Sequence, residues 1–227
     1  QHAQHGRLVD KHDKSAAMYL PEHFAQRDVA ALHTLMQQHP LATLVSVGPD
    51  GPTADHIPLE LDASAGPHGT LRGHVARANP LWQAAAGTAV LAVFSGPQAY
   101  VTPSWYPSKA ATHKVVPTWN YTVVHAQGML RAVEDAPWLH ALVSRLTGHQ
   151  EAPRALPWAV GDAPEDFVQG LLRAIVGIEI PLTSLVGKWK ISQNRSAADR
   201  LGVAQGLAEQ GGSGAHAMAA LVRPGKG

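Results

Sequence analysis

The sequence contains a series of strand-like runs joined by turns, with few helical segments between them. The first two runs, residues 41–47 and 53–61, flank the turn sequence GPDG at residues 48–51, which predicts a β-hairpin. Further runs rich in β-branched or aromatic residues follow at 71–75, 89–94, 98–106, 115–133 and 176–190. A doubly wound parallel sheet would need regular alternation of strands and helices, which this chain lacks. We therefore predict a mainly β protein, in which about six antiparallel strands close into a small barrel with peripheral helices.

Helical periodicity and capping residues mark the segments that we expect to cover this barrel. Apolar residues recur at helical spacing within residues 26–39, and Asp135 and Ser196 are candidate N-caps of two later helices. The polar, His-rich residues 1–17 are interpreted as a tag or disordered extension. We expect the remaining chain to consist of a split-barrel domain with helical additions, residues 18–210, followed by a Gly-rich flexible tail, residues 211–227.

Composition excludes several classes of function. The 18 Lys and Arg residues against 17 Asp and Glu residues give a net charge of +1, too little for a strong field toward nucleic acid or an anionic membrane. The chain has no cysteine, which excludes disulfides, thiolate catalysis and Cys-based metal sites. No apolar run approaches the roughly 20 residues that span a bilayer, and we expect a cytoplasmic protein with no membrane contact.

The stretch LRGHVARANPLW at residues 71–82 is the first candidate binding site. It is predicted to run from a strand into a helix over residues 80–86, opened by Asn79 as N-cap and Pro80 at the first helical position. A helix N-terminus can hold an anion, and Arg72, His74 and Arg77 add donors on the approach. The stretch therefore indicates either a phosphate cradle or a strand–helix corner with solvated arginines.

A second candidate site is aromatic. Trp105, Tyr106, Trp119 and Tyr121 bracket Lys109, Lys114 and Asn120, a combination that suits a flat heterocycle carrying a phosphate. An aromatic core or a dimer interface explains the same residues equally well. The basic segment at residues 187–195, GKWKISQNR, is consistent with anion binding or with a solvated turn.

Metal and nucleophile chemistry find little support in the sequence. Of the fourteen histidines, His56, His74 and His125 fall on different predicted strands, but none of the fourteen forms an H-x-x-x-H pair, so we predict no metal site. There is no G-x-S-x-G, P-loop or G-x-G-x-x-G motif, and catalytic residues cannot be assigned.

Five segments, in order, carry a resemblance to a known family. They are MYLPEHF, LRGHVARANPLW, AYVTPSWY, KVVPTWNY and GKWKISQNR, spread over residues 18–207. Together they resemble the PaiB-type FMN-binding negative transcriptional regulators. The resemblance implies an FMN-binding split β-barrel, related to pyridoxamine-phosphate-oxidase-like flavoproteins, that forms a homodimer with FMN at the subunit interface.

The resemblance also implies which residues hold FMN. The strand and helix start that hold the phosphate in the wider group correspond here to Arg72, Gly73, His74, Arg77 and Asn79, although Ala78-Asn79 stands where that group usually carries an Arg-Lys pair. The strand beside the isoalloxazine ring implicates His56. Trp119, Asn120 and Tyr121 would come from near the subunit interface. The basic residues Lys114 and Lys190 complete the set of expected FMN-binding residues.

The resemblance implies a negative regulator of transcription that acts through flavin or ligand binding. No helix-turn-helix signature is visible and the net charge is nearly zero, so direct DNA binding is doubtful. Two alternatives stay open: an FMN-dependent oxidoreductase acting on a small molecule, and a haem-binding or haem-degrading split barrel.

Overall fold

Over residues 18–224, the protein is built on one antiparallel sheet of nine strands. The computed structural model describes residues 18–224. The strand order is β3-β2-β6-β7-β9-β5-β4, and β1 and β8 pair with β9 beside this path. Because β3 and β4 end the path without a ladder between them, the sheet curves into a barrel that is not closed. The strands are β1 (Ala25–Gln26), β2 (Leu41–Gly48), β3 (Gly51–Pro58), β4 (Glu60–Asp62), β5 (Thr70–Ala76), β6 (Ala89–Val101), β7 (Thr118–Met129), β8 (Arg131–Val133) and β9 (Ile175–Lys190).

Helices lie around this sheet, as the sequence predicts for a mainly β protein with peripheral helices. The α-helices are α1 (Val29–Gln38), α2 (Leu81–Ala84), α3 (Ser108–Thr112), α4 (Ala136–Glu151), α5 (Glu165–Arg173), α6 (Ala197–Gln210) and α7 (Ser213–Val222). Three short 3-10 helices are η1 (Glu22–Phe24), η2 (Pro103–Trp105) and η3 (Val160–Asp162). Among residues 18–224, no helix is long and apolar enough to cross a membrane.

The strand number differs from the predicted six because two expected strands divide and because β1 lies outside the predicted runs. The run 53–61 breaks at Leu59, whose N–H leaves the ladder to donate to the Pro40 carbonyl. The run 115–133 breaks at Leu130, which bonds to Thr88 instead. Conversely, the runs 89–94 and 98–106 join into β6 through a bulge between Ser95 and Gln98.

A second bulge confirms the bend predicted at Gly128. The β7–β9 register shifts between Gln127 and Gly128. A Cβ at this position would collide with the Pro181 carbonyl oxygen and with Ile180. The close approach of two backbones therefore requires glycine here.

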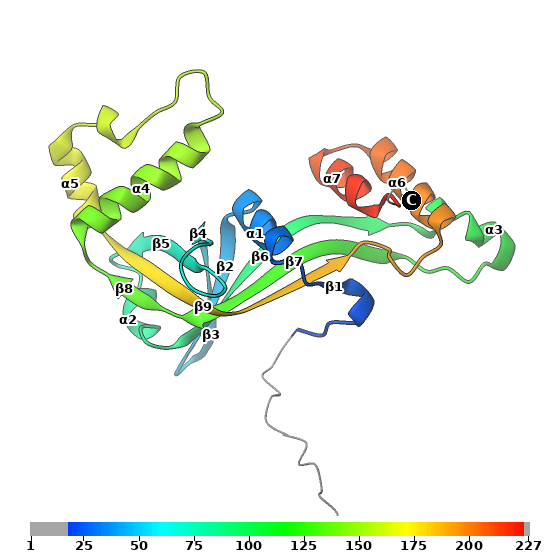
Figure 1. Ribbon diagram of the computed structural model, residues 1–227, viewed down its shortest axis with the longest axis horizontal. Coiled ribbons are helices and arrows are strands. Elements are labelled where there is room, and N and C mark those ends of the chain that lie inside the picture. Colours follow the sequence, from blue (N-terminus) through cyan, green and yellow to red (C-terminus); the bar gives the residue numbers. More distant parts are fainter. Residues whose placement is uncertain (1–17, 225–227) are drawn as a thin grey trace, which may run out of the picture.

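The buried apolar side chains of the described residues form three clusters: a barrel core, a core beneath α6 and α7, and a small cluster between α4 and α5. The barrel core includes Leu44, Leu71, Phe94 and Ile178, all essentially inaccessible to solvent, and α1 contributes Met36 to it. Beyond the barrel, β6, β7 and β9 continue as a three-stranded extension toward α3, with α6 and α7 packed over it (Figure 1). We call this extension, from residue 98 on β6 through α3 to residue 123 on β7 and residues 188–192, the arm.

The C-terminal segment corrects one prediction. Instead of a flexible tail, residues 213–222 form α7, in which Met218 and Val222 are fully buried against β6 and α6. The pair Gly211-Gly212, both at positive φ, allows the chain to reverse between α6 and α7. The predicted extension at residues 1–17 and the last three residues of the tail lie outside the described residues.

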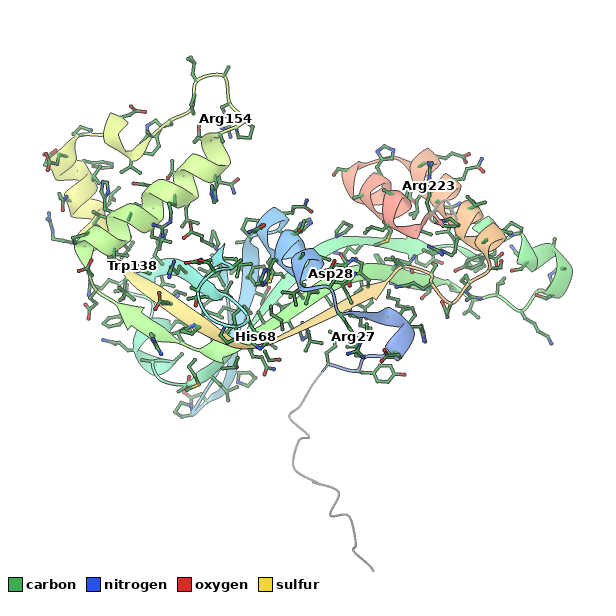
Figure 2. All side chains as sticks on the ribbon, viewed as in Figure 1. Arg27, Asp28, His68, Trp138, Arg154 and Arg223 are labelled. Carbon is green, nitrogen blue, oxygen red and sulfur yellow. The ribbon has the colours of Figure 1, made fainter. Side chains whose placement is uncertain are left out.

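The helices α4 and α5 cover the opposite end of the sheet from α6 and α7 (Figure 1). As predicted, Asp135 caps α4: its side chain accepts a hydrogen bond of 2.7 Å from the Trp138 N–H. Trp138 lies at the base of α4 (Figure 2) and contacts β9 at Gly177, where any Cβ would collide with the indole ring. The N-cap and this contact fix how α4 stands on the outer face of the sheet.

Candidate functional site

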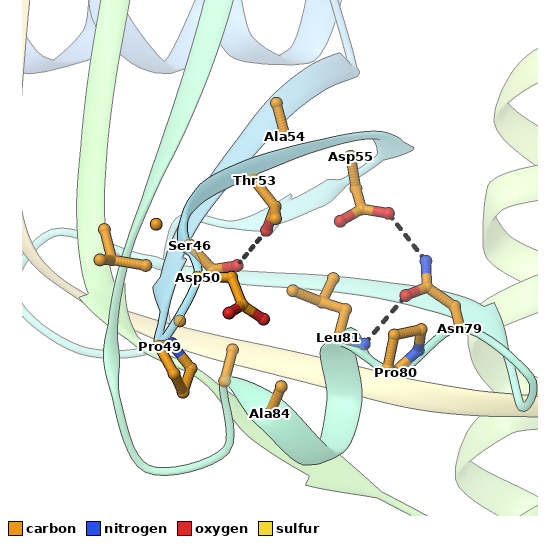
Figure 3. Close-up of a pocket in the computed structure, with 14 residues that line it drawn as sticks. Ser46, Pro49, Asp50, Thr53, Ala54, Asp55, Asn79, Pro80, Leu81 and Ala84 are labelled. Carbon is orange, nitrogen blue, oxygen red and sulfur yellow. Dashed lines mark hydrogen bonds between the residues drawn. The ribbon is translucent and has the colours of Figure 1, made fainter.

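The open end of the barrel contains a cavity of about 440 Å³ between the β2–β3 hairpin and α2, which we call the barrel mouth (Figure 3). Ser46 and Thr53, opposite each other on β2 and β3, are bonded at 3.0 Å inside it. The ionisable side chains among its described lining residues are Asp50 and Asp55. Two carboxylates and no cation make the barrel mouth unfavourable for a phosphate dianion.

The strand–helix corner at Asn79 differs from the predicted phosphate cradle. The expected helix 80–86 is only the four-residue α2, too short for an appreciable helix dipole. The helix also begins one residue later than predicted, with Pro80 rather than Asn79 in the N-cap position, although the Asn79 Oδ1 accepts a hydrogen bond of 2.9 Å from the Leu81 N–H. Its Nδ2 donates to Asp55 at 2.8 Å, so the side chain ties β3 to the corner (Figure 3).

The arginines of the predicted cradle are engaged by protein groups. On the outer face of β5, Arg72 bonds to Asp62 at 2.9 Å and to Glu179 at 3.0 Å. Ser64 first, and Arg72 second, lower the pKa of the Asp62 carboxyl by hydrogen bonding. All three charged side chains are at most about a third exposed, so Arg72 neutralises two partly buried carboxylates rather than a ligand.

Arg77 holds the corner against the start of β9. Its guanidinium donates to the carbonyls of Arg173, at 2.9 Å, and Ile175, at 3.3 Å, and pairs with Glu134 at 2.6 Å. The same group lies 5.8 Å from the centre of the Trp82 ring. With 42% of its side chain exposed, Arg77 is more accessible than Arg72, and a ligand phosphate would have to compete with Glu134 for it.

Gly73 and His74 point to opposite sides of β5. A Cβ on Gly73 would press into Leu59 and the Pro58 carbonyl inside the barrel, so this glycine allows close packing. His74 lies on the outer face, under α4 and α5, and lines a second cavity there. Burial lowers the pKa of its imidazole. Arg72, His74 and Asn79 thus have different neighbours, and their proposed role in holding a phosphate rests on the resemblance alone.

The edge strand β3 offers an open surface of the barrel. β3 pairs with β2 only, which leaves its other edge without a ladder partner among residues 18–224. Ala54, His56 and Pro58 on its outer side are exposed. Free backbone groups beside an accessible imidazole can bind the polar edge of a planar heterocycle.

The aromatic candidates lie on the arm. Trp119 is 55% exposed and meets Tyr100 edge to face, with ring centres 6.0 Å apart. The ammonium of Lys188 lies over the Tyr121 ring, 5.6 Å from the ring centre. An exposed aromatic pair on a protruding element is typical of an interface.

The other arm candidates divide into a structural residue and two cations. Asn120 is buried and donates to the Ser192 hydroxyl at 2.9 Å, which holds the turn where Ser192 adopts a φ of 66°. Lys190 donates to the Thr118 hydroxyl at 2.6 Å. The side chain of Lys114 is exposed in the loop after α3.

Lys188 belongs to the basic segment GKWKISQNR but is absent from the residues that the resemblance assigns to FMN. It is 7% exposed, and its ammonium donates to the Tyr19 carbonyl at 2.9 Å while facing the Tyr19 ring at 5.4 Å. Burial, and then the nearby charge of Lys188, lower the pKa of His125. The alternation of GKWK places Lys188 with Lys190 on the face opposite Trp189, which predicts a solvent-exposed lysine, so the sequence offers no signal for its burial.

The described residues contain no group of three or more His, Asp or Glu side chains that could hold a metal ion. His56 is exposed on β3 and His74 lies beneath α4 and α5. These two histidines and His125 therefore do not converge inside the barrel.

Solved structures with the same fold define the class. The fold matches the FAD- and haem-binding protein from Mycobacterium smegmatis, with a TM-score of 0.54 and 15% identity over 73% of each chain. It also matches the flavocytochrome Anf3 from Azotobacter vinelandii, with a TM-score of 0.53 and 12% identity over 73% of this chain and 69% of that one. The predicted split-barrel fold class is thereby confirmed.

Sequence comparison gives the family. Residues 18–184 match the model described as "Putative FMN-binding domain", and the chain belongs to this family. The Bacillus subtilis protein named protease synthase and sporulation protein PAI 2 is 31% identical over 209 residues, covering 90% of this chain and 96% of that one. An uncharacterised Aspergillus fumigatus protein is 35% identical over 240 residues, covering 86% and 92%. The PaiB-type resemblance is confirmed, and FMN is the cofactor.

The residues that suit FMN lie in two parts of the fold, the free edge of β3 and the arm. The free edge of β3 and His56 suit the ring, while the exposed Lys114, the partly buried Lys190 and the exposed Trp119 lie on the arm. In one chain the barrel end of β3 and the end of the arm are far apart (Figure 1). One chain therefore does not assemble the whole set of candidate residues.

Proposed function

We propose that the protein is a homodimeric, FMN-binding negative regulator of transcription that responds through its flavin or another bound ligand. The proposed dimer is supported mainly by one observation: the candidate FMN-binding residues are divided between the barrel and the arm. In a twofold dimer the arm of one protomer can reach the β3 edge of its partner, and symmetry then builds two equal sites. The exposed pair Tyr100 and Trp119 gives such an arm an apolar contact surface.

In this arrangement each candidate residue has a limited role. His56 and the free edge of β3 would bind the ring edge, and Trp119 from the partner would cover its face. Arg77, with Lys114 and Lys190 of the arm, would balance the phosphate charge. The flavin supplies reversible electron transfer when bound. The protein residues hold and shield it.

The first test is the visible spectrum of protein purified without added cofactor, with the released ligand identified by mass. We expect a flavin spectrum, FMN as the released ligand, and a light-scattering mass of two chains. A mass of one chain with FMN fully bound would refute the shared site.

Replacing Trp119 with alanine tests the role of the arm. Interface tryptophans often contribute about 2 kcal/mol or more, so we expect the dimer dissociation constant to rise roughly 30-fold or more. FMN affinity should fall with it. Leu156→Ala is the matched control, because Leu156 is 91% exposed in the loop between α4 and α5, far from the arm. Equal dimer and FMN affinity in both variants would remove Trp119 from the site.

Direct DNA binding is expected to be weak and unspecific. Three basic side chains are engaged within the fold: Arg72 and Arg77 are paired with carboxylates and Lys188 is buried. The test is titration of an operator-sized duplex at about 150 mM salt with scrambled duplex as competitor. Nanomolar binding that survives the competitor would contradict this expectation and indicate direct repression.

Flavin reduction separates the regulator from an oxidoreductase. Rapid reduction of the bound flavin by a nicotinamide cofactor, followed by turnover with an added acceptor, would favour the enzyme. Absence of turnover, together with a ligand-dependent effect on transcription, would favour the regulator.

A further inference from the structure

The turn after β9 joins segments of the arm that are far apart in the sequence. Asn120 of β7 donates a hydrogen bond of 2.9 Å to the hydroxyl of Ser192, across 72 positions in the chain. The guanidinium of Arg195 lies over the ring of Tyr106, 4.9 Å from the ring centre. Three of the five segments that carry the family resemblance, AYVTPSWY, KVVPTWNY and GKWKISQNR, therefore meet at this turn.

The side chain of Asn120 lies on the covered side of the arm. Asn120 is 1% exposed and pairs with Ala99, which belongs to the core beneath α6 and α7. Its neighbour Trp119 pairs with Tyr100 and is 55% exposed. Because side chains alternate across a strand, Trp119 and Asn120 point to opposite faces. We call the face that carries Tyr100 and Trp119 the open face of the arm, and Asn120 does not lie on it.

The turn itself needs support from side chains. Ser192 has a φ of 66°, a backbone conformation that residues other than glycine rarely adopt. Gln193 Oε1 accepts from the Ile191 N–H at 2.8 Å, and the Arg195 N–H donates to the Ser192 carbonyl at 3.0 Å. The bond from Asn120 is the link between this turn and β7. A strained turn keeps its shape only through such surrounding contacts, so loss of the Asn120 side chain should let it relax.

Lys190 stands directly before this turn. It pairs with Tyr121 at the last step of the β7–β9 ladder, next to Asn120 on one strand and two residues before Ser192 on the other. Thr118 is the one hydrogen-bond partner of its ammonium among residues 18–224, so two N–H groups remain for a phosphate. The end of a ladder opens easily. The bond between Asn120 and Ser192 lies just beyond the last pair and holds it closed.

We propose that Asn120 is a positioning residue for the phosphate of FMN. It acts through Ser192, whose turn keeps Lys190 in place at the end of β9, and it does not touch the cofactor. This role rests on the binding of FMN between the arm and the β3 edge of a partner that is proposed above. It replaces the direct contact that the resemblance implies for Asn120.

FMN titration of a folded Asn120→Ala variant is the first test. We expect FMN to bind about tenfold more weakly, the scale of one misplaced hydrogen bond from a charged group. Leu139→Ala is the matched control, because Leu139 is 2% exposed in α4, at the opposite end of the sheet from the arm (Figure 1). It should lower stability but leave FMN affinity unchanged. Wild-type FMN affinity in Asn120→Ala would overturn the proposal.

A double variant, Asn120→Ala with Ser192→Gly, separates positioning from direct contact. Glycine adopts a φ of 66° without strain, and both partners of the buried hydrogen bond are removed together. We therefore expect FMN affinity to return to within about threefold of wild type. Amide exchange at residues 191–195, measured without FMN, should be faster in Asn120→Ala and slow again in the double variant. An FMN affinity as low as that of Asn120→Ala alone would mean that Asn120 contacts FMN directly, against the proposal.

Lys190→Met distinguishes failure of this role from failure of the proposed site. If the arm supplies charge to the phosphate, Lys190→Met should weaken FMN, and adding Asn120→Ala should weaken it little further, because both changes act through one ammonium. If Lys190→Met binds FMN like wild type, the proposed site and the positioning role both fail. If Lys190→Met weakens FMN and Asn120→Ala does not, the proposed site stands and only the positioning role fails.

Discussion

An Arg72→Ala variant is expected to lose about 2–3 kcal/mol of unfolding free energy. The substitution leaves Asp62 and Glu179 without their shared partner. The side chain of Asp62 is only 31% exposed and that of Glu179 only 22%. Truncating one partner of a fully buried ion pair costs about 3–5 kcal/mol, and partial solvent access lowers that figure here. Denaturant unfolding of wild type and variant measures the difference.

The pH dependence of stability is a second test of the ion pair between Arg72 and Asp62. The pKa of Asp62 is lowered in the folded protein, so this carboxylate adds stability above its unfolded pKa near 3.8. That contribution disappears as the pH falls through the folded pKa. The difference in unfolding free energy between wild type and Arg72→Ala should therefore become smaller as the pH falls below about 4.

A charge-free variant distinguishes an ion-pair role from a phosphate role. Arg72→Met combined with Asp62→Asn and Glu179→Gln removes all three charges and should recover most of the lost stability. If the single Arg72→Ala variant is as stable as wild type but binds FMN more weakly, the arginine serves the cofactor instead, as the family resemblance implies.

The sequence predicts what depends on local patterns. The hairpin at residues 48–51, the N-caps Asp135 and Ser196, and the bulge at Gly128 all follow from turn, capping and glycine chemistry within a few residues. The same local reasoning is wrong for residues 213–222. There the glycines suggest a mobile tail, but Met218 and Val222 are buried by contacts with β6 and α6, far away in sequence.

The candidate site is harder to predict because side-chain partners are chosen by tertiary packing. The stretch at residues 71–82 shows donors on a strand before a helix start, and nothing in it indicates that Arg72 meets Glu179, 107 residues away. Nor does it indicate that α4 and α5 cover His74. The aromatic set divides between its interpretations: Trp119 is exposed, as a stacking surface or an interface requires, whereas Tyr106 is buried in a hydrophobic core.

A Gly206→Ala variant is expected to destabilise the arm by about 2–3 kcal/mol. In α6, Gly202 and Gly206 lie against η2: a Cβ on Gly206 would collide with the indole ring of Trp105, and one on Gly202 would collide with the Trp105 carbonyl oxygen. The added methyl must displace either the indole or the helix. Overpacking costs typically 1–3 kcal/mol, and expulsion of a tryptophan costs more.

The same substitution elsewhere in the chain is the control. Gly170 lies in α5 with no heavy atom nearer than 3.9 Å to an added Cβ, so Gly170→Ala should stabilise by up to about 1 kcal/mol through helix propensity alone. Opposite signs for the two variants in denaturant unfolding would confirm that Trp105 docks on the glycine face of α6. Because the same helix packs over the arm, Gly206→Ala should also weaken the dimer, whereas Gly170→Ala should leave it unchanged. A Gly206→Ala variant as stable as Gly170→Ala would mean that η2 and α6 do not meet in this way.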